Sequence, residues 1–555
     1  MDALPRRDAL LLLAVLGAGV FLSGLELMIT AVALPAIVID LADWTRLREA
    51  SWIINGYLLV FVVTMPLAGR LADLWGNRRL FLWALVLFTV GSLLAGLAPS
   101  LEVLVAARLV QAAGGGILVP VATSATTHLF AGAARPRALG VIGALTFLGM
   151  AAGPFLGAAI LGAFHPEAAL SRLGVPPGSP LPDALAPAWR WVFYVNVPIG
   201  LIALLVAWAA STGWETPRRA GRVDIVGAAV FSLFLLGTLG SLTLLGSRAE
   251  GEGGGIDPAM VSAVLALTAV VGLVVTIVRG FRVRDPFLDP RLFRSASFSS
   301  ATLVSGLTGY GFATAIVGGA VFVDRVLYGG PDEQRLALGA LAGATAAGAL
   351  LSGFAVRLLR LRLVTLIGLG ASIVALVVMA GWTRETSVEQ AALALGVFGA
   401  GFGLTVTPRS TAAVEAVSRE AYGVASSTVT VARMVGMAVG LAILTAYGST
   451  TIDRLYDQVY ATPDAYREFI PASLRDRPLR DGLVVEALEA WAAGEAGRIM
   501  VGVFLVAAGV TAAAIPPSLL LDRRRRMLAE AGVDPAASTT GAGDADGSTD
   551  PAIIA

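Results

Sequence analysis

Three ionisable side chains lie inside long apolar stretches of the sequence, where charge is rare. Glu26 is the only carboxylate near the middle of such a stretch, Arg108 lies within another, and Arg433 is midway through a third. A buried carboxylate beside an arginine can gain and lose a proton, because burial favours its neutral form and the guanidinium favours its charged form. Arginine itself keeps its proton. Its role would be to hold the carboxylate and then release it.

Glu26 and Arg433 lie in opposite halves of the chain and at similar depth in their stretches, so we expect them to pair across a central cavity. A permanent buried ion pair that only fixes packing is the competing interpretation. Arg409 is nearer the end of its stretch, from which a long side chain can reach the membrane surface. The sequence has no recognisable metal cluster, phosphate-binding loop or nucleophile triad.

Composition places these residues in a membrane. Of the 555 residues, 56% are hydrophobic and 14% are charged, whereas soluble proteins contain about 25% charged residues. So much apolar surface must face lipid. A secreted domain, a nucleic-acid binder built on a basic face and a cytosolic enzyme are therefore excluded. With a net charge of +1, no overall electric field selects an acidic partner. Cysteine is absent, which excludes disulfides and Cys-ligated metals.

A bilayer core needs roughly 20 apolar residues per helix. Fourteen stretches meet this length and predict an all-α polytopic protein with fourteen spans: 9–39, 52–69, 80–98, 101–129, 138–164, 191–210, 225–246, 258–278, 298–323, 336–356, 363–382, 390–407, 422–447 and 499–521. Arginines gather in alternate connections, and cytoplasmic loops carry the excess of basic residues. Both termini are therefore predicted to be cytoplasmic.

Two outer connections and the tail stand apart from the spans. Residues 165–188 contain several prolines and predict an extended loop. Residues 448–497 carry apolar side chains at helical spacing, which predicts two amphipathic helices that continue the spans beyond the membrane. A solvated cap without a function is the alternative. The tail at 529–555 is rich in small and polar residues and is predicted to be disordered.

Short motifs recur about 285 residues apart, which indicates an internal repeat. One pair begins at Gly149 and Gly436, and another at Gly69 and Gly353. We therefore predict an N-terminal six-helix bundle at 1–210, two inserted transmembrane helices at 211–284, and a C-terminal six-helix bundle at 285–528. Paired halves of this kind place a substrate site at their interface near the midplane.

A short segment between the second and third spans combines glycines with charges at the predicted cytoplasmic face. Its members, here called the latch residues, are Gly69, Arg70, Asp73, Gly76, Arg78 and Arg79. The glycines permit a tight turn and close helix approach. Asp73 can pair with an arginine or with an adjacent helix end. Such a cluster would hold one conformation and break in the other; an ordinary loop that obeys the positive-inside rule is the alternative.

The segment 69–80 resembles the signature loop of the major facilitator superfamily. Arg108, Gln111 and the glycines at 114–116 resemble its fourth-helix motif, and 149–157 resembles a fifth-helix motif of exporters. Residues 25–26 with 33–35, and the run 189–198, resemble patterns of its 14-span drug:proton antiporters. The resemblance implies two six-helix bundles plus two inserted helices, and a proton-coupled antiporter.

The fifth-helix motif also has a packing interpretation. Its distinctive residues are Gly149, Gly153, Pro154 and Gly157. Small residues let helices approach closely, and a proline kinks its helix. We expect this packing at the interface between the halves, where the resemblance implies a seal against proton leakage.

One subgroup, the mycobacterial triacylglyceride exporters, resembles this chain more closely. The run 431–437, with Arg433 at mid-span, and the long outer connection carry that resemblance. Phe147 stands where the subgroup has a second carboxylate. Arg357 stands where the second-half copy of the loop motif would place an acid, so only the N-terminal latch is expected to be intact.

Together these features predict a proton-coupled exporter in a bacterial-type inner (plasma) membrane, which moves lipophilic or amphipathic compounds by alternating access, as in multidrug efflux. Its partners are the cargo, protons and membrane lipids, and the proton gradient takes the place of any cofactor. One alternative is export of a triacylglyceride-like lipid from the inner leaflet to a lipid-binding partner at the outer face. Another is a passive scramblase or scaffold. An enzyme is not expected, because no pair of carboxylates or histidines lies within the spans.

Overall fold

The computed structural model describes residues 6–41, 50, 52–132, 134–163, 185–209, 224–244, 257–284, 286–459, 465–478 and 480–522, and over these residues every regular element is a helix. Most of the predicted loop at 165–188 and the whole predicted tail at 529–555 lie outside them.

Fourteen helices in the described part of the chain are long and apolar enough to cross a membrane, which confirms the predicted number of spans. In the first half these helices are α1 (Arg6–Leu41), α3 (Trp52–Trp75), α4 (Asn77–Gly96), α5 (Leu101–Leu129), α6 (Ala134–Ala163), and α9 (Arg190–Tyr194) with α10 (Asn196–Ala209). The inserted pair is α11 (Ile225–Leu244) and α12 (Pro258–Arg282).

The second half repeats the arrangement. It contains α13 (Ala296–Val321), α14 (Pro331–Leu358), α15 (Leu361–Ala380), α16 (Val388–Glu415), α17 (Tyr422–Val459), α18 (Gly482–Ala512) and α19 (Ile515–Ser518). Short turns accompany them: η2 (Pro290–Arg294), η3 (Phe322–Val326), η4 (Arg419–Ala421), η5 (Ala465–Phe469) and η6 (Ala472–Leu474).

Local sequence explains where several helices begin. The hydroxyl of Ser100 caps α5, and the carboxylates of Asp257 and Asp481 cap α12 and α18. Ser387 and Gln390 form a reciprocal capping box at the start of α16. These side chains satisfy backbone N–H groups that have no partner within the helix. Burial alone would raise the pKa of Asp224, which precedes α11, but hydrogen bonds from Arg279 and from the backbone of Gly227 and Phe287 outweigh it and lower that pKa.

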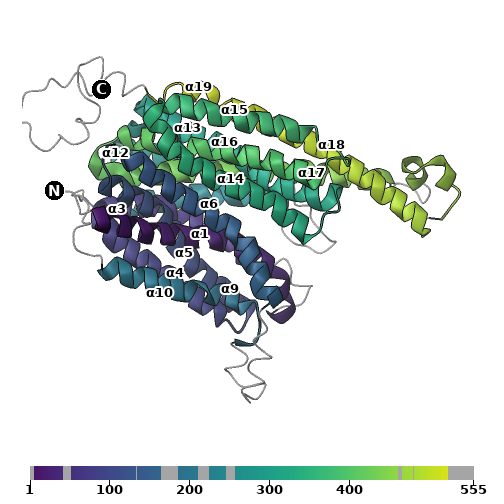
Figure 1. Ribbon diagram of the computed structural model, residues 1–555, viewed down its shortest axis with the longest axis horizontal. Coiled ribbons are helices and arrows are strands. Elements are labelled where there is room, and N and C mark those ends of the chain that lie inside the picture. Colours follow the sequence, from purple (N-terminus) through teal and green to yellow (C-terminus); the bar gives the residue numbers. More distant parts are fainter. Residues whose placement is uncertain are drawn as a thin grey trace, which may run out of the picture.

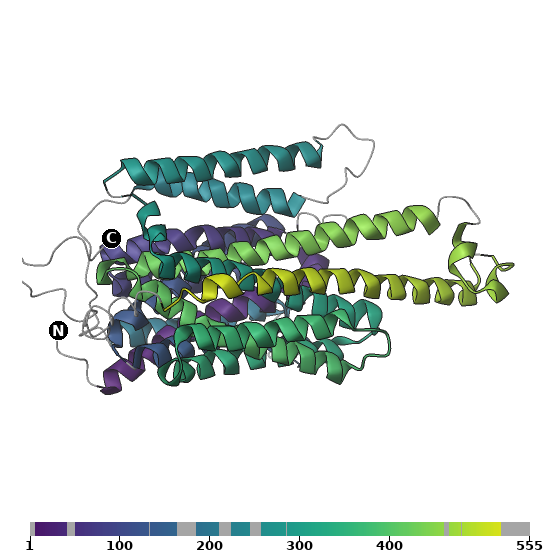
Figure 2. The ribbon, with the colours of Figure 1, turned by 90° about the horizontal axis from the view of Figure 1, so that it is seen from above.

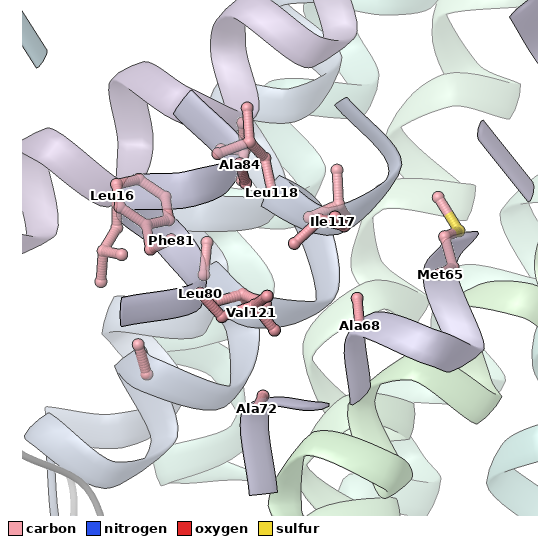
Figure 3. Close-up of a cluster of buried hydrophobic side chains, with 14 of the residues drawn as sticks. Leu16, Met65, Ala68, Ala72, Leu80, Phe81, Ala84, Ile117, Leu118 and Val121 are labelled. Atoms are coloured by element: carbon pink, nitrogen blue, oxygen red, sulfur yellow. The ribbon is translucent and has the colours of Figure 1, made fainter. Parts of the chain in front are cut away.

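The N-terminal helices and the C-terminal helices form two groups that lie side by side (Figure 1). Buried apolar clusters lie within each group. In the N-terminal core, side chains from α1, α3, α4 and α5 meet, as the close-up of Leu16, Met65, Phe81 and Leu118 shows (Figure 3). Glycines bring α4 and α5 together: a Cβ on Gly114 would lie 2.4 Å from the backbone N of Phe88. Close backbone contact of this kind stabilises helix pairs in lipid, where the hydrophobic effect between helices is weak.

The inserted helices α11 and α12 lie beside the two bundles as a separate layer (Figure 2). Many apolar side chains of α12, such as Leu267 and Val270, are exposed on the protein surface, as expected for a helix that faces lipid. The guanidinium of Arg279 at the end of α12 contacts the carboxylate of Asp224 at 2.7 Å. This ion pair joins the start of α11 to the end of α12.

Two helices extend well past the others at one end of the molecule (Figure 2). We call this the hairpin end, and the end where α1 begins and α19 lies is the terminal end. Helix α17 continues to Val459 and α18 begins at Gly482, which confirms that helices continue these two spans. Their tips are joined by a small apolar cluster of Val459, Tyr466, Ile470 and Val484.

Candidate functional site

Glu26 lies at the centre of a polar cluster inside the N-terminal bundle. Its side chain is 0% exposed. Oε1 accepts a hydrogen bond from the guanidinium of Arg108 on α5 and one of 2.9 Å from the hydroxyl of Thr30 on α1. Oε2 accepts one of 2.6 Å from the side-chain amide of Asn196 on α10. Three helices therefore supply donors to one buried carboxylate.

The guanidinium of Arg108 is itself held in place. Its Nη1 donates to Oε1 of Gln111 at 2.8 Å, and its Nε donates to the carbonyl of Ile53 at 3.4 Å. The ring of Tyr57 on α3 lies 4.0 Å from the guanidinium carbon, a cation–π contact. A buried ion pair is tolerated when such additional contacts satisfy both groups.

Ser92 of α4 connects the amides around this pair. Its hydroxyl accepts hydrogen bonds from Gln111 at 2.7 Å and from Asn196 at 3.2 Å, and donates to the carbonyl of Phe193. No pattern in the sequence assigned a role to Thr30, Ser92 or Asn196. The available signal was the position of Asn196, a polar residue at the start of an apolar span and within the motif at 189–198.

The predicted pair between Glu26 and Arg433 is not formed in this structure. The ion-pair partner of Glu26 is Arg108. The guanidinium of Arg433, on α17, instead lies 5.5 Å from the ring centre of Phe147 on α6, and its Nε has no hydrogen-bond partner. Arg108 is nearer because α5 packs directly on α1 within one bundle, a proximity that depth along the spans did not reveal.

The latch residue Asp73 joins the two bundles at the terminal end. Its carboxylate accepts hydrogen bonds from the backbone N–H groups of Gly423 at 2.8 Å and Val424 at 3.0 Å, in the first turn of α17. A carboxylate is stabilised there by unpaired N–H groups and by the positive end of the helix dipole. The structure therefore contains the predicted pairing of Asp73 with an adjacent helix end.

Close packing surrounds this cap. A Cβ on Gly69 would lie 2.5 Å from the carbonyl oxygen of Gly423, so α3 and α17 touch through backbone. Tyr422, the first residue of α17, lies against the ring of His128 at 4.8 Å and below the guanidinium of Arg135 at 5.7 Å. The N-terminal bundle thus contacts the start of α17 through three helices.

The remaining latch residues form the turn between α3 and α4. Gly76 has a φ of 88°, in the left-handed region that favours glycine, and so permits the tight turn. Arg70 is buried, Arg78 is partly buried and Arg79 is exposed.

A related contact occurs between α6 and α14. A Cβ on Gly353 would lie 2.7 Å from the carbonyl oxygen of Pro136, and one on Gly140 would lie 2.9 Å from that of Ala349. Gly353 follows Gly69 by about 285 residues, the spacing of the repeat. Arg357, four residues further on, is exposed on the protein surface.

The glycines of the fifth-helix motif pack α6 against α1, within the N-terminal bundle. A Cβ on Gly149 would lie 2.2 Å from the carbonyl oxygen of Phe21, and one on Gly153 would lie 2.9 Å from the N of Ile29. Gly157 approaches Ile29 as well, and Pro154 lies inside the same helix. The expected position at the interface between the halves is therefore wrong, because the interface uses other positions of α6, such as Gly140.

Fourteen membrane-length helices in two bundles, with a buried ion pair inside one bundle and an aspartate that caps a helix of the other, are typical of a membrane transporter. The family model described as Major Facilitator Superfamily matches residues 16–441. The chain belongs to this superfamily.

Individual relatives agree with this assignment. A triacylglyceride transporter of Mycolicibacterium hassiacum is 31% identical over 78% of this chain and 78% of that protein. A multidrug transporter of Bacillus subtilis is 27% identical over 80% of this chain and 77% of its own length. Among solved structures, a human organic anion transporter superposes with a TM-score of 0.56 at 14% identity, covering 91% of this chain and all of that one. That likeness supports the fold alone.

Proposed function

We propose that the chain is a proton-driven exporter of the plasma membrane of a bacterium, and that the terminal end faces the cytoplasm. Arginines gather at the connections of that end, as the positive-inside rule requires. The observation that carries the proposal is Glu26, a carboxylate that is fully buried and held by donors from three helices. Intramembrane carboxylates of this kind are costly and mark proton or substrate pathways.

Protonation changes what Glu26 can bind. The neutral acid loses its charge attraction to Arg108, and its new O–H needs an acceptor. The Oδ1 atom of Asn196 is buried without a hydrogen-bond partner, and it belongs to the amide whose nitrogen already contacts Glu26. A protonated Glu26 would donate to this oxygen. Arg108 would keep its contacts to Gln111, Ile53 and Tyr57, and the weakened ion pair would let α1 and α5 shift.

Alternating access then follows from the contacts between the bundles. Asp73 of α3 binds the start of α17, and Gly353 of α14 packs against α6. The terminal end is therefore closed. Opening it toward the cytoplasm requires that both contacts separate as the bundles rock. Cargo would leave outward while Glu26 takes a proton from outside, and the proton would leave inward. The proton gradient supplies the free energy, and no cofactor is needed.

Transport in liposomes tests the proposal. We expect the protein to concentrate a lipophilic or amphipathic dye only when a pH gradient is imposed, and Glu26→Gln to equilibrate the dye without concentrating it. Glu385→Gln, which removes an exposed carboxylate outside the spans, is the matched control. Concentrative transport by the Glu26→Gln protein would refute proton coupling through Glu26. Equal transport by the unchanged protein with a collapsed gradient would indicate a scramblase.

A lipid cargo is the second candidate, and the hairpin end favours it. The base of the α17–α18 hairpin is tied to the C-terminal bundle by Tyr328, which donates to the carbonyl of Glu489, and by Arg384, which donates to that of Ala490. A helical extension of this length would guide a long acyl chain past the outer leaflet to a lipid-binding partner. Shortening 448–497 should therefore abolish transfer of a fluorescent triacylglyceride and leave dye efflux intact. Equal loss of both would assign the hairpin a structural role.

A further inference from the structure

Two arginines are buried in the C-terminal bundle without an acidic partner. Arg409 on α16 is 2% exposed and Arg433 on α17 is 9% exposed. Their guanidinium groups lie over two rings, Phe402 and Phe147, that contact each other, so the two charges are near enough to repel. Within the described residues, neither guanidinium forms an ion pair, and the Nε of Arg433 has no hydrogen-bond partner.

Their surroundings are aromatic. Nη1 of Arg409 donates to the hydroxyl of Thr308 at 2.5 Å, and its guanidinium lies 5.0 Å from the ring centre of Phe402. Arg433 lies 5.5 Å from the ring of Phe147. Phe147, Phe312 and Phe402 contact one another, with ring centres 4.3 to 5.5 Å apart. One helix of the N-terminal bundle and two of the C-terminal bundle supply these rings.

Aromatic faces cannot balance two buried charges. A cation–π contact is modest compared with an ion pair, and a buried charge is normally paired and hydrogen-bonded. Arginine presents its donors as a planar fork that fits carboxylate and phosphate oxygens. An anion placed beside these two guanidinium groups would relieve their repulsion and satisfy the unpartnered Nε of Arg433.

We propose that Arg409 and Arg433 bind the anionic head group, carboxylate or phosphate, of an amphipathic cargo whose apolar tail lies along Phe147, Phe312 and Phe402. The inference rests on the proposed export function and names its cargo class. Because Phe147 belongs to α6 and both arginines belong to the other bundle, the bound cargo would touch both bundles. Its affinity would then change as the bundles separate.

Equilibrium binding tests this assignment without a pH gradient, so its failure is distinct from a failure of proton coupling. The protein is placed in nanodiscs of neutral phosphatidylcholine and titrated calorimetrically with decyl phosphate, and empty nanodiscs correct for partitioning. Decanol tests whether the tail alone suffices, and inorganic phosphate tests whether the head group alone suffices. We expect saturable binding of decyl phosphate and much weaker binding of both other probes.

Variants then locate the site. Arg433→Gln and Arg409→Gln should each weaken binding of decyl phosphate about tenfold or more, because each removes a charge-assisted contact. Arg360→Gln, which removes an exposed arginine at the start of α15, should leave it unchanged. Phe147→Glu should abolish binding by placing an internal carboxylate beside Arg433, whereas Phe147→Gln should retain it. Thermal unfolding shows that each variant is folded.

Two results would overturn the proposal. One is equal affinity of decyl phosphate for the unchanged protein and for a folded Arg433→Gln protein. The other is equal affinity for decanol and decyl phosphate, which would mean that the tail alone is recognised. Tight binding of inorganic phosphate alone would contradict an amphipathic cargo and indicate a free anion.

Discussion

At the residue scale, the chemistry depends on how one carboxylate is surrounded. Glu26 is bound by a guanidinium, a hydroxyl and an amide, and Ser92 links the amides of Gln111 and Asn196 behind it. Every member of this network except Glu26 and Arg108 is neutral. The network can therefore change donors and acceptors when a proton arrives, without burying a further charge.

Asn196 is predicted to position Glu26. A hydrogen bond to a charged group contributes about 1.5–3 kcal/mol, so Asn196→Ala should lower the maximal rate of gradient-driven efflux about tenfold. The KM for cargo should stay unchanged, because Asn196 contacts Glu26 and Ser92. Ser124→Ala is the control, since the buried hydroxyl of Ser124 has no hydrogen-bond partner. A rise in KM with an unaltered maximal rate would contradict the positioning role.

At the element scale, α6 lies between the two charged sites. Gly149 and Gly153 bring α6 into contact with the part of α1 that contains Glu26. Phe147, on the same stretch of α6, faces Phe402 and Arg433. A movement of α6 relative to α1 would therefore alter the surroundings of Arg433. We therefore expect α6 to connect the proposed proton binding at Glu26 with the C-terminal bundle.

The contact between α6 and α1 should tolerate no side chain at Gly149. Its Cβ would lie 2.2 Å from the carbonyl oxygen of Phe21, so Gly149→Ala must push two backbones apart, at a cost of about 1–3 kcal/mol. Gly162→Ala on the same helix meets no atom within 4 Å and should be neutral or slightly stabilising. Thermal unfolding in detergent measures both.

Leakage of protons into liposomes tests whether this contact is also a seal. Gly149→Ala should raise the passive leak, and Gly162→Ala should not. A Gly149→Ala protein that unfolds at an unchanged temperature and leaks no faster would show that the close contact has neither role.

At the scale of the whole molecule, two related contacts close the terminal end. Asp73 and Gly69 of α3 hold the start of α17, and Gly353 of α14 meets the start of α6. The first contact includes a charged cap, and the second combines close backbone packing with a cation–π contact between Arg137 and Phe354. The two sides of the closure therefore differ in kind, and a substitution of Asp73 removes the charged cap while it leaves the contact at Gly353 in place.

Asp73→Ala should shift the molecule toward a state that is open at the terminal end. Loss of a helix cap costs about 1 kcal/mol, which changes the ratio of two states roughly fivefold. The chain has no native cysteine, so spin labels at Ala131→Cys and Leu358→Cys report the distance between the bundles directly. We expect a longer distance to appear in the Asp73→Ala protein.

Asp257→Ala provides the control for this measurement. Asp257 also caps a helix, but it caps α12, the helix that it precedes, so its loss leaves the contact between the bundles intact. The same distance distribution in the Asp73→Ala and Asp257→Ala proteins would mean that Asp73 stabilises α17 without controlling the closure.

The sequence by itself determined the class of the protein. Composition, the fourteen apolar stretches and the motifs at 69–80, 108–116 and 149–157 identified a two-bundle transporter and named Glu26, Arg108 and Asp73. These features are local, because a span needs only length and apolarity, and a charge within a span is visible without knowing its neighbours.

Tertiary structure alone decided which side chains meet. Depth along the spans suggested Arg433 as the partner of Glu26, but the packing of α5 on α1 places Arg108 beside it. Asn196, which contacts the same carboxylate, lies 170 residues further along the chain. Packing also places the glycines of α6 against α1. It places the guanidinium groups of Arg409 and Arg433 over phenylalanine rings. Such pairings depend on how each helix is rotated about its axis, and helices that are apolar on every face carry little sequence signal for that rotation.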